Sequence, residues 1–138
     1  MMDDQQLKAH CLSWAHWCRT RKYFAPPVPQ NLLSRMQPRS RPGVEVDHEM
    51  SQDLPFFNMA IHALADECPE DAMCFSLYYF HGIRPVKVIA SALGIGQRTF
   101  YDRLNKFSRR AQQASAAIKR VHLEHTAVSK NLDNATVD

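Results

Sequence analysis

The turn that decides the fold lies in residues 92–107, whose sequence is ALGIGQRTFYDRLNKF. A short apolar segment ends at Gly94, Ile95 follows, and a segment rich in polar and charged residues begins at Gly96 or Gln97. Glycine readily adopts the left-handed conformation that often ends a helix. We therefore predict two helices joined by a tight turn at Gly94.

The residues on either side of this turn have the pattern of a helix-turn-helix. Such a unit needs a small residue where the helices cross, a glycine in the turn, an apolar residue after it, and a second helix with a polar outward face. Ala90, Gly94 and Ile95 fill the first three positions, while Phe100 and Leu104 form the inward face of the second helix. This pattern predicts a unit that can lie against DNA.

The side of the second helix that points away from Phe100 carries side chains suited to DNA. Arg98 can bond guanine through two hydrogen bonds, and basic residues further along can neutralise phosphate. We expect Asp102 to form an ion pair with Arg98, which lies four residues earlier in the helix. The Asp102 carboxylate could instead accept a hydrogen bond from cytosine. The candidate DNA-binding residues are Gln97, Arg98, Tyr101, Asp102, Asn105, Lys106, Arg109 and Arg110.

The remaining sequence shows helical spacing and no strand-like alternation, so we predict an all-α fold. Prolines open several apolar segments, and Gly82 marks the end of one. We expect one small helical domain over residues 1–125, with an N-terminal helix at 4–20, core helices at 53–82 and the helix-turn-helix at 85–110. Residues 126–138 are expected to form a disordered tail.

Residues 21–52 interrupt the helical pattern. They contain five of the eight prolines and predict a long, basic, proline-rich loop with at most one helical turn, near Leu32 and Leu33. Such an arm could follow nucleic-acid backbone or unpaired bases, and a solubilising linker is the alternative. The candidate residues of an arm facing RNA or polymerase are Arg19, Arg21, Lys22, Arg35, Arg39 and Arg41.

Charge is segmented along the chain. Residues 1–43 carry seven Lys or Arg and two Asp or Glu, residues 44–83 carry eight acids and no Lys or Arg, and residues 84–138 carry ten Lys or Arg and four acids. The net charges are therefore +5, −8 and +6. The basic ends favour polyanionic partners, while the acidic block could face a basic protein or only solvent.

Other classes of function find little support in the sequence. No apolar run approaches the ~20 residues of a membrane helix, and the opening MMDDQQLKAHC has no apolar signal segment, so we expect a reducing cytoplasm. The cysteines occur in pairs seven and six residues apart, unlike metal ligands, so we expect free thiols, no metal and no cofactor. The EVDHEM cluster at residues 45–50 stands alone, and we expect no enzyme.

One family resemblance rests on two segments. Residues 72–111, AMCFSLYYFHGIRPVKVIASALGIGQRTFYDRLNKFSRRA, resemble the DNA-binding end of phage Q-type late-gene antitermination proteins, whose helix-turn-helix is itself similar to region 4 of bacterial sigma factors. LSWAHWC at residues 12–18 resembles the paired-Trp opening of many of those proteins. The resemblance covers about residues 7–115, and its most specific part is the order of Trp pair, proline-rich basic spacer and Tyr-Tyr-Phe helix before the turn.

This resemblance implies a transcription antitermination factor. Such proteins bind double-stranded DNA overlapping a promoter, load onto a paused, sigma-containing RNA polymerase, and act at its RNA-exit channel so that transcription passes terminators. The partners of such a protein would be double-stranded DNA, RNA polymerase and, as an open alternative, nascent RNA. More than one copy of the protein could bind the DNA. Some members carry a CxxC zinc site that this chain lacks. The alternatives are a simple helix-turn-helix activator or repressor, and a polymerase-binding inhibitor.

Overall fold

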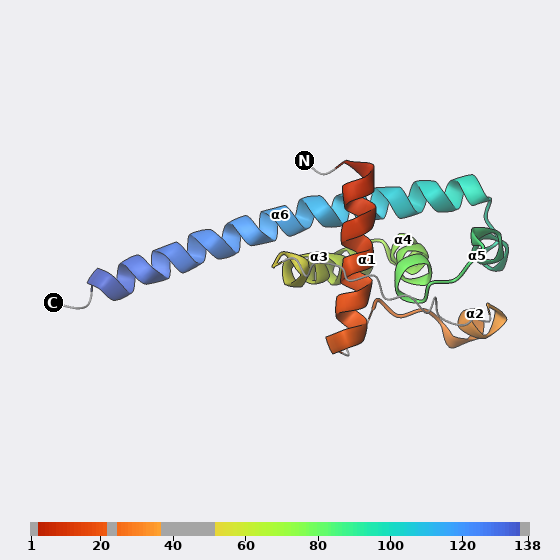
Figure 1. Cartoon of the computed structure of the whole chain (residues 1–138), viewed down its shortest axis with the longest axis horizontal. Helices are drawn as coiled ribbons and strands as arrows, with labels where there is room; N and C mark the ends of the chain where they lie inside the picture. Colours follow the sequence, from red (N-terminus) through yellow and green to blue (C-terminus); the bar gives the residue numbers. More distant parts are fainter. Residues whose placement is uncertain (1–2, 22–24, 37–51, 136–138) are drawn as a thin grey trace.

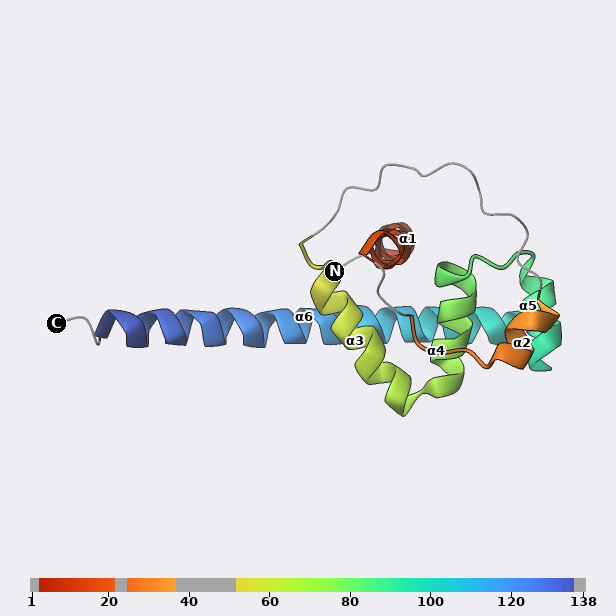
Figure 2. The same ribbon diagram turned by 90° about the horizontal axis from the view of Figure 1, so that it is seen from below.

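A computed structural model describes the backbone of residues 3–21, 25–36 and 52–135, and the side chains up to residue 127. In these residues the fold is all-α, as predicted, and contains no strand. The elements are α1 (Asp4–Arg21), α2 (Gln30–Arg35), α3 (Leu54–Glu67), α4 (Pro69–Phe75), the π-helical segment η1 (Ser76–Phe80), α5 (Val86–Leu93) and α6 (Gln97–Ala135). Helix α6 forms the long axis, and its C-terminal half extends away from the other helices (Figures 1 and 2).

The core forms where α1, α3 and α4 meet the first half of α6. Phe75 lies at its centre, with ring centroids 5.1 Å from Trp14, 6.5 Å from Phe57 and 5.1 Å from Phe107. The Trp14 Nε1 group donates a 3.0 Å hydrogen bond to Asn58 Oδ1, which satisfies the polar atom of this buried indole. Trp14 is thus a core anchor.

Several helix boundaries follow from the signals in the sequence. Helix α3 has Pro55 in its first turn, and α4 begins at Pro69. The helical run of α4 and η1 stops before Gly82, whose φ of 62° is left-handed. In η1 the His81 N–H bonds the Ser76 carbonyl at 2.9 Å, five residues back, so this turn is wider than an α-helical turn. The sequence predicted the stop at Gly82 but not the π-helical turn.

Part of the expected proline-rich loop packs onto the body. Helix α2 lies within it, close to the predicted turn, and Pro26 and Met36 on either side of α2 are buried. The buried Ser76 hydroxyl donates a 3.1 Å hydrogen bond to the Pro26 carbonyl. Residues 25–36 are therefore attached to the core, whereas residues 22–24 and 37–51 lie outside the described residues.

The C-terminal end also differs from the expected tail. Helix α6 continues to Ala135, so residues 126–135 are helical, and residues 136–138 lie outside the described residues. Among the described side chains, the last aromatic contact between the body and this helix joins Phe56 and His122, at a centroid distance of 5.3 Å. Beyond it, Leu123 and the residues up to 127 are mostly exposed. The weak apolar spacing of this segment does not prevent it from continuing the helix.

Candidate nucleic-acid interface

The turn between α5 and α6 has the geometry that its sequence predicts. Gly94 has a φ of 70° and lies in the left-handed region. The Ile95 N–H bonds the Ala90 carbonyl at 3.0 Å, and the Gly94 N–H bonds the Ser91 carbonyl at 3.2 Å. These two bonds form a Schellman motif, which satisfies carbonyl groups at the end of α5 and redirects the chain into α6.

The inward face of α6 matches the predicted one. Phe100, Leu104, Phe107 and Ala111 are all buried, with at most 3% of each residue exposed. Their burial fixes the rotation of α6 about its axis, because these residues must all face the core. The polar residues between them are consequently directed to other sides of the helix.

Most of the candidate DNA-binding residues lie on the solvent side of α6. Arg98 and Lys106 are exposed and take part in no ion pair within the described part of the chain. Tyr101 has 42% of its surface exposed. The exposed candidates in the first three turns are Gln97, Arg98, Tyr101, Asp102, Asn105 and Lys106. The structure therefore gathers six of the eight candidates on accessible turns of one helix.

The other two candidates are arranged differently. Arg109 is exposed but forms an ion pair with Asp4 of α1. Arg110 is half-buried, with its guanidinium 3.6 Å from a carboxylate oxygen of Glu67 and 3.0 Å from the Cys68 sulfur. The sequence suggested that both residues would be available to phosphate. Instead, both guanidinium groups already have partners in the protein.

The expected pair between Asp102 and Arg98 is not formed. Among the ion pairs of the described residues, none joins these two side chains. Both are exposed near the start of α6, where water competes with such a pair. Arg98 can therefore contact a ligand without first breaking an ion pair with Asp102.

The candidate residues of the basic arm do not all lie in an extended loop. Arg19 and Arg21 belong to the last turn of α1, which agrees with the predicted helix for Arg19 but places Arg21 outside the predicted loop. An Arg19 Nη1 group donates a 3.3 Å hydrogen bond to the Phe80 carbonyl, and the Arg21 guanidinium lies 5.8 Å from the Trp17 ring centroid. Arg35 is exposed in the last turn of α2. Lys22, Arg39 and Arg41 lie outside the described residues.

The acidic block contacts the basic side of α6. Arg103 lies 3.7 Å from Glu70 and 4.0 Å from Asp71, and Lys119 lies 2.7 Å from Asp53. With the Arg110 pair, this places four carboxylates of the block against basic side chains of the same chain. Part of the alternation of charge along the sequence therefore reflects packing between α3, α4 and α6.

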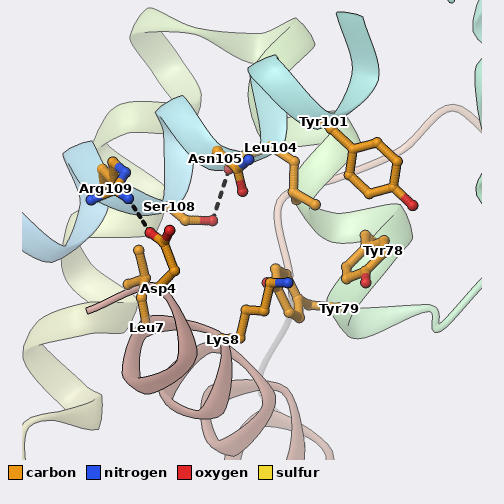
Figure 3. Close-up of a pocket in the computed structure, with 10 residues that line it drawn as sticks. All are labelled: Asp4, Leu7, Lys8, Tyr78, Tyr79, Tyr101, Leu104, Asn105, Ser108 and Arg109. Atoms are coloured by element: carbon orange, nitrogen blue, oxygen red, sulfur yellow. Dashed lines mark hydrogen bonds and ion pairs between the residues drawn. The ribbon is translucent and has the colours of Figure 1, made fainter. Parts of the chain in front are cut away.

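A pocket of about 160 Å³ lies beside the exposed face of α6. Figure 3 shows α1 on one side of it, α6 on the opposite side, and tyrosine rings along a third side. Its polar lining includes Lys8, Asn105 and the paired Asp4 and Arg109, and its apolar lining includes Tyr78. No motif in the sequence predicted a site that includes Asp4, Lys8, Tyr78 or Tyr79.

The inner wall of the pocket is buried and held in place. Tyr79 and Ser108 are buried, and the Ser108 hydroxyl donates a 2.8 Å hydrogen bond to the Leu104 carbonyl. Burial raises the pKa of the Cys11 thiol to about 12, although the neighbouring Ser108 and Tyr79 side chains oppose the rise. Burial also raises the pKa of Tyr79 well above its usual range, so its hydroxyl stays protonated. These neutral groups form a fixed wall rather than a reactive centre.

No protein-family model matches the chain, and neither does any curated protein or solved structure. Within residues 3–21, 25–36 and 52–127, no three His, Cys, Asp or Glu side chains are grouped so that they could hold a metal. No helix in the described part of the chain combines the length and apolar character needed to cross a membrane.

Proposed function

We propose that the chain binds double-stranded DNA through a helix-turn-helix formed by α5 and α6, and that it acts as a transcription antitermination factor. The observation that carries the DNA-binding part is the left-handed turn at Gly94 followed by exposed Arg98, Asp102 and Asn105 on one side of α6. Residues at spacings of three and four follow one side of a helix, so these side chains can reach one groove together.

The dimensions of α6 suit the major groove. An α-helix with its side chains is about 10–12 Å across, and the groove is about 12 Å wide, so the first turns of α6 can enter it. Arg98 would bond a base edge, while Lys106 would meet a phosphate. The ion pair of Arg109 with Asp4 lies at the end of this stretch, so α1 would limit how far α6 lies along the groove.

The antitermination part rests on the resemblance to Q-type proteins. The contact with sigma-containing RNA polymerase would use surfaces other than the carboxylates of Asp53, Glu67, Glu70 and Asp71, because these face basic residues of α6. Nascent RNA would contact the remaining basic residues of the arm. Among the described arm residues, Arg35 is exposed and lies outside α1, so it stays in this role.

A footprint on promoter DNA tests the first part. We expect Arg98→Ala to weaken specific binding about fivefold or more, since a bidentate base contact is worth about 1–3 kcal/mol. Arg120→Ala removes the same charge from an exposed position about 33 Å further along α6 and is the matched control. If both variants lose affinity equally, α6 does not read DNA in this way.

Transcription with purified polymerase tests the second part. A template with the cognate promoter and a downstream terminator should give longer transcripts when the protein is present, and Arg98→Ala should abolish them. DNA binding with unchanged termination would instead support a simple activator or repressor. Inhibition independent of Arg98 would support a polymerase-binding inhibitor. The arm is best tested by Arg39→Gln with Arg41→Gln, because deleting residues 26–42 would remove buried Met36.

A further inference from the structure

We propose that the pocket between α1, η1 and α6 holds an unpaired base of a nucleic-acid strand. This inference rests on the proposed function for the source of the strand, because a protein loaded at a promoter meets melted DNA and RNA. The pocket itself is defined by its lining and its volume of about 160 Å³. The ligand class follows from the aromatic, polar and charged groups that surround this volume.

The aromatic wall offers rings to a flat ligand. Tyr101 is 42% exposed, Tyr78 is half-buried, and both line the pocket on the same side (Figure 3). The Tyr78 ring is fixed by the Arg84 guanidinium, 3.5 Å from its centroid, and by an edge contact with Tyr79 at 4.8 Å. A fixed ring can stack with any base, because every base has an aromatic face.

The walls formed by α1 and α6 offer hydrogen-bonding groups. Asn105 carries an amide that can both donate and accept, and Lys8 is an exposed ammonium donor. The Oδ1 atom of Asp4 pairs with Arg109, which leaves its Oδ2 atom able to accept from a ligand N–H. The edge of a base presents donors and acceptors side by side, so these groups match it.

The charge of the pocket favours a base over a phosphate inside it. Arg109 is neutralised by Asp4, whose carboxylate would repel a phosphate placed beside it. A neutral base has no such penalty and can use the carboxylate as an acceptor. Lys8, exposed on the first turns of α1, can then contact the phosphate attached to that base.

The pocket lies next to the side of α6 that is proposed to enter the DNA groove. Tyr101 and Asn105 line the pocket and also belong to the exposed side of α6. A strand that leaves the duplex beside α6 therefore reaches the pocket without crossing the body. Duplex binding and base capture would use neighbouring but separable residues, with Arg98 outside the pocket and Lys8 and Tyr78 inside it.

The experiment compares three fluorescent probes by anisotropy: a fully paired promoter duplex, the same duplex with one extrahelical nucleotide, and a 12-nucleotide single strand made as DNA or as RNA. The variants are Lys8→Ala and Tyr78→Leu, with Arg120→Ala as the charge control and thermal melting as the folding check. DNA and RNA arms distinguish the source of the base.

We expect wild-type protein to bind the bulged duplex more tightly than the paired one. Tyr78→Leu should remove that gain and weaken single-strand binding about fivefold or more, which corresponds to the loss of one stacking contact. Lys8→Ala should have a smaller effect, while paired duplex binding stays unchanged in both. Wild-type affinities that do not depend on the unpaired base, or pocket variants that bind like wild type, would overturn the proposal. Failure of the helix-turn-helix is distinguishable, since it removes binding of the paired duplex.

Discussion

Arg109 of α6 and Asp4 of α1 form an ion pair that connects the first turn of α1 to the side of α6 proposed to face DNA. The two residues are 105 positions apart in sequence, and both are largely exposed. An exposed pair contributes only about 0–1 kcal/mol to stability. Its main consequence is electrostatic, since it determines whether the Arg109 charge is available to a polyanion.

Asp4→Asn should release Arg109 and strengthen DNA binding. The freed guanidinium can then contact phosphate, so affinity should rise severalfold at low salt and the dependence of log K on log salt should steepen by about one unit. Anisotropy titrations over a range of NaCl concentrations measure both quantities. Asp66→Asn, an equal change of charge at an exposed position of α3, is the control. An equal gain in both variants would mean that only net charge matters.

Gly94→Ala should destabilise the turn without any steric clash. A Cβ atom at Gly94 would meet nothing within 4 Å, but its φ of 70° is left-handed, and an L-residue there loses about 1–2 kcal/mol. Urea unfolding should show that loss. The matched control is Gly96→Ala, where a Cβ also meets nothing and φ lies outside the left-handed range, so the change should be near zero. Equal losses at both positions would contradict the role of φ.

Thiol labelling should distinguish one cysteine from the other three. Burial raises the pKa of Cys11 and Cys18 to about 12 and that of Cys74 to about 11. Because thiolate is the reactive form, roughly one in a thousand or fewer of these groups is reactive at pH 8. Cys68 is partly exposed beside Arg110. Brief alkylation followed by peptide mass spectrometry should therefore modify Cys68 first, and equal labelling of Cys18 would contradict the buried environment.

The stability of the fold should fall as pH decreases from 7 to 5, partly because of His10. Burial lowers the pKa of His10, although Asp53 opposes the shift, and its ring lies 4.5 Å from Phe57. A lowered folded pKa means that the unfolded chain binds the proton more strongly, so this stability is present above the unfolded pKa of about 6.5 and is lost as pH falls through the folded pKa.

His10→Gln should therefore flatten the pH dependence of the unfolding free energy in this range, measured by urea titration at each pH. His81, whose pKa is also lowered by burial and by Arg19, keeps its own contribution in that variant. Exposed His125→Gln is the control and should leave the profile steep. A profile that His10→Gln does not change would assign the acid sensitivity to other groups.

Local signals predicted the helices well because their causes are local. A left-handed glycine ends α5 at Gly94 and the preceding helical run at Gly82, and prolines begin α3 and α4, all through backbone geometry that a few residues determine. The inward face of α6 was also predictable, since apolar side chains at helical spacing must be buried together. The exposed Arg98 and its neighbours then follow from the rotation of the same helix.

What the sequence determined by itself is therefore most of the helices, the turn at Gly94 and the polar side of α6, but not the π-helical turn of η1 or the helical end of α6. Only the tertiary structure decided that α1 crosses α6, that Asp4 occupies Arg109, and that the acidic block pairs with basic residues such as Arg103. These contacts join residues distant in sequence, and their partners are selected by how whole helices pack, which no local pattern encodes. The pocket exists for the same reason, because its walls come from three separate elements.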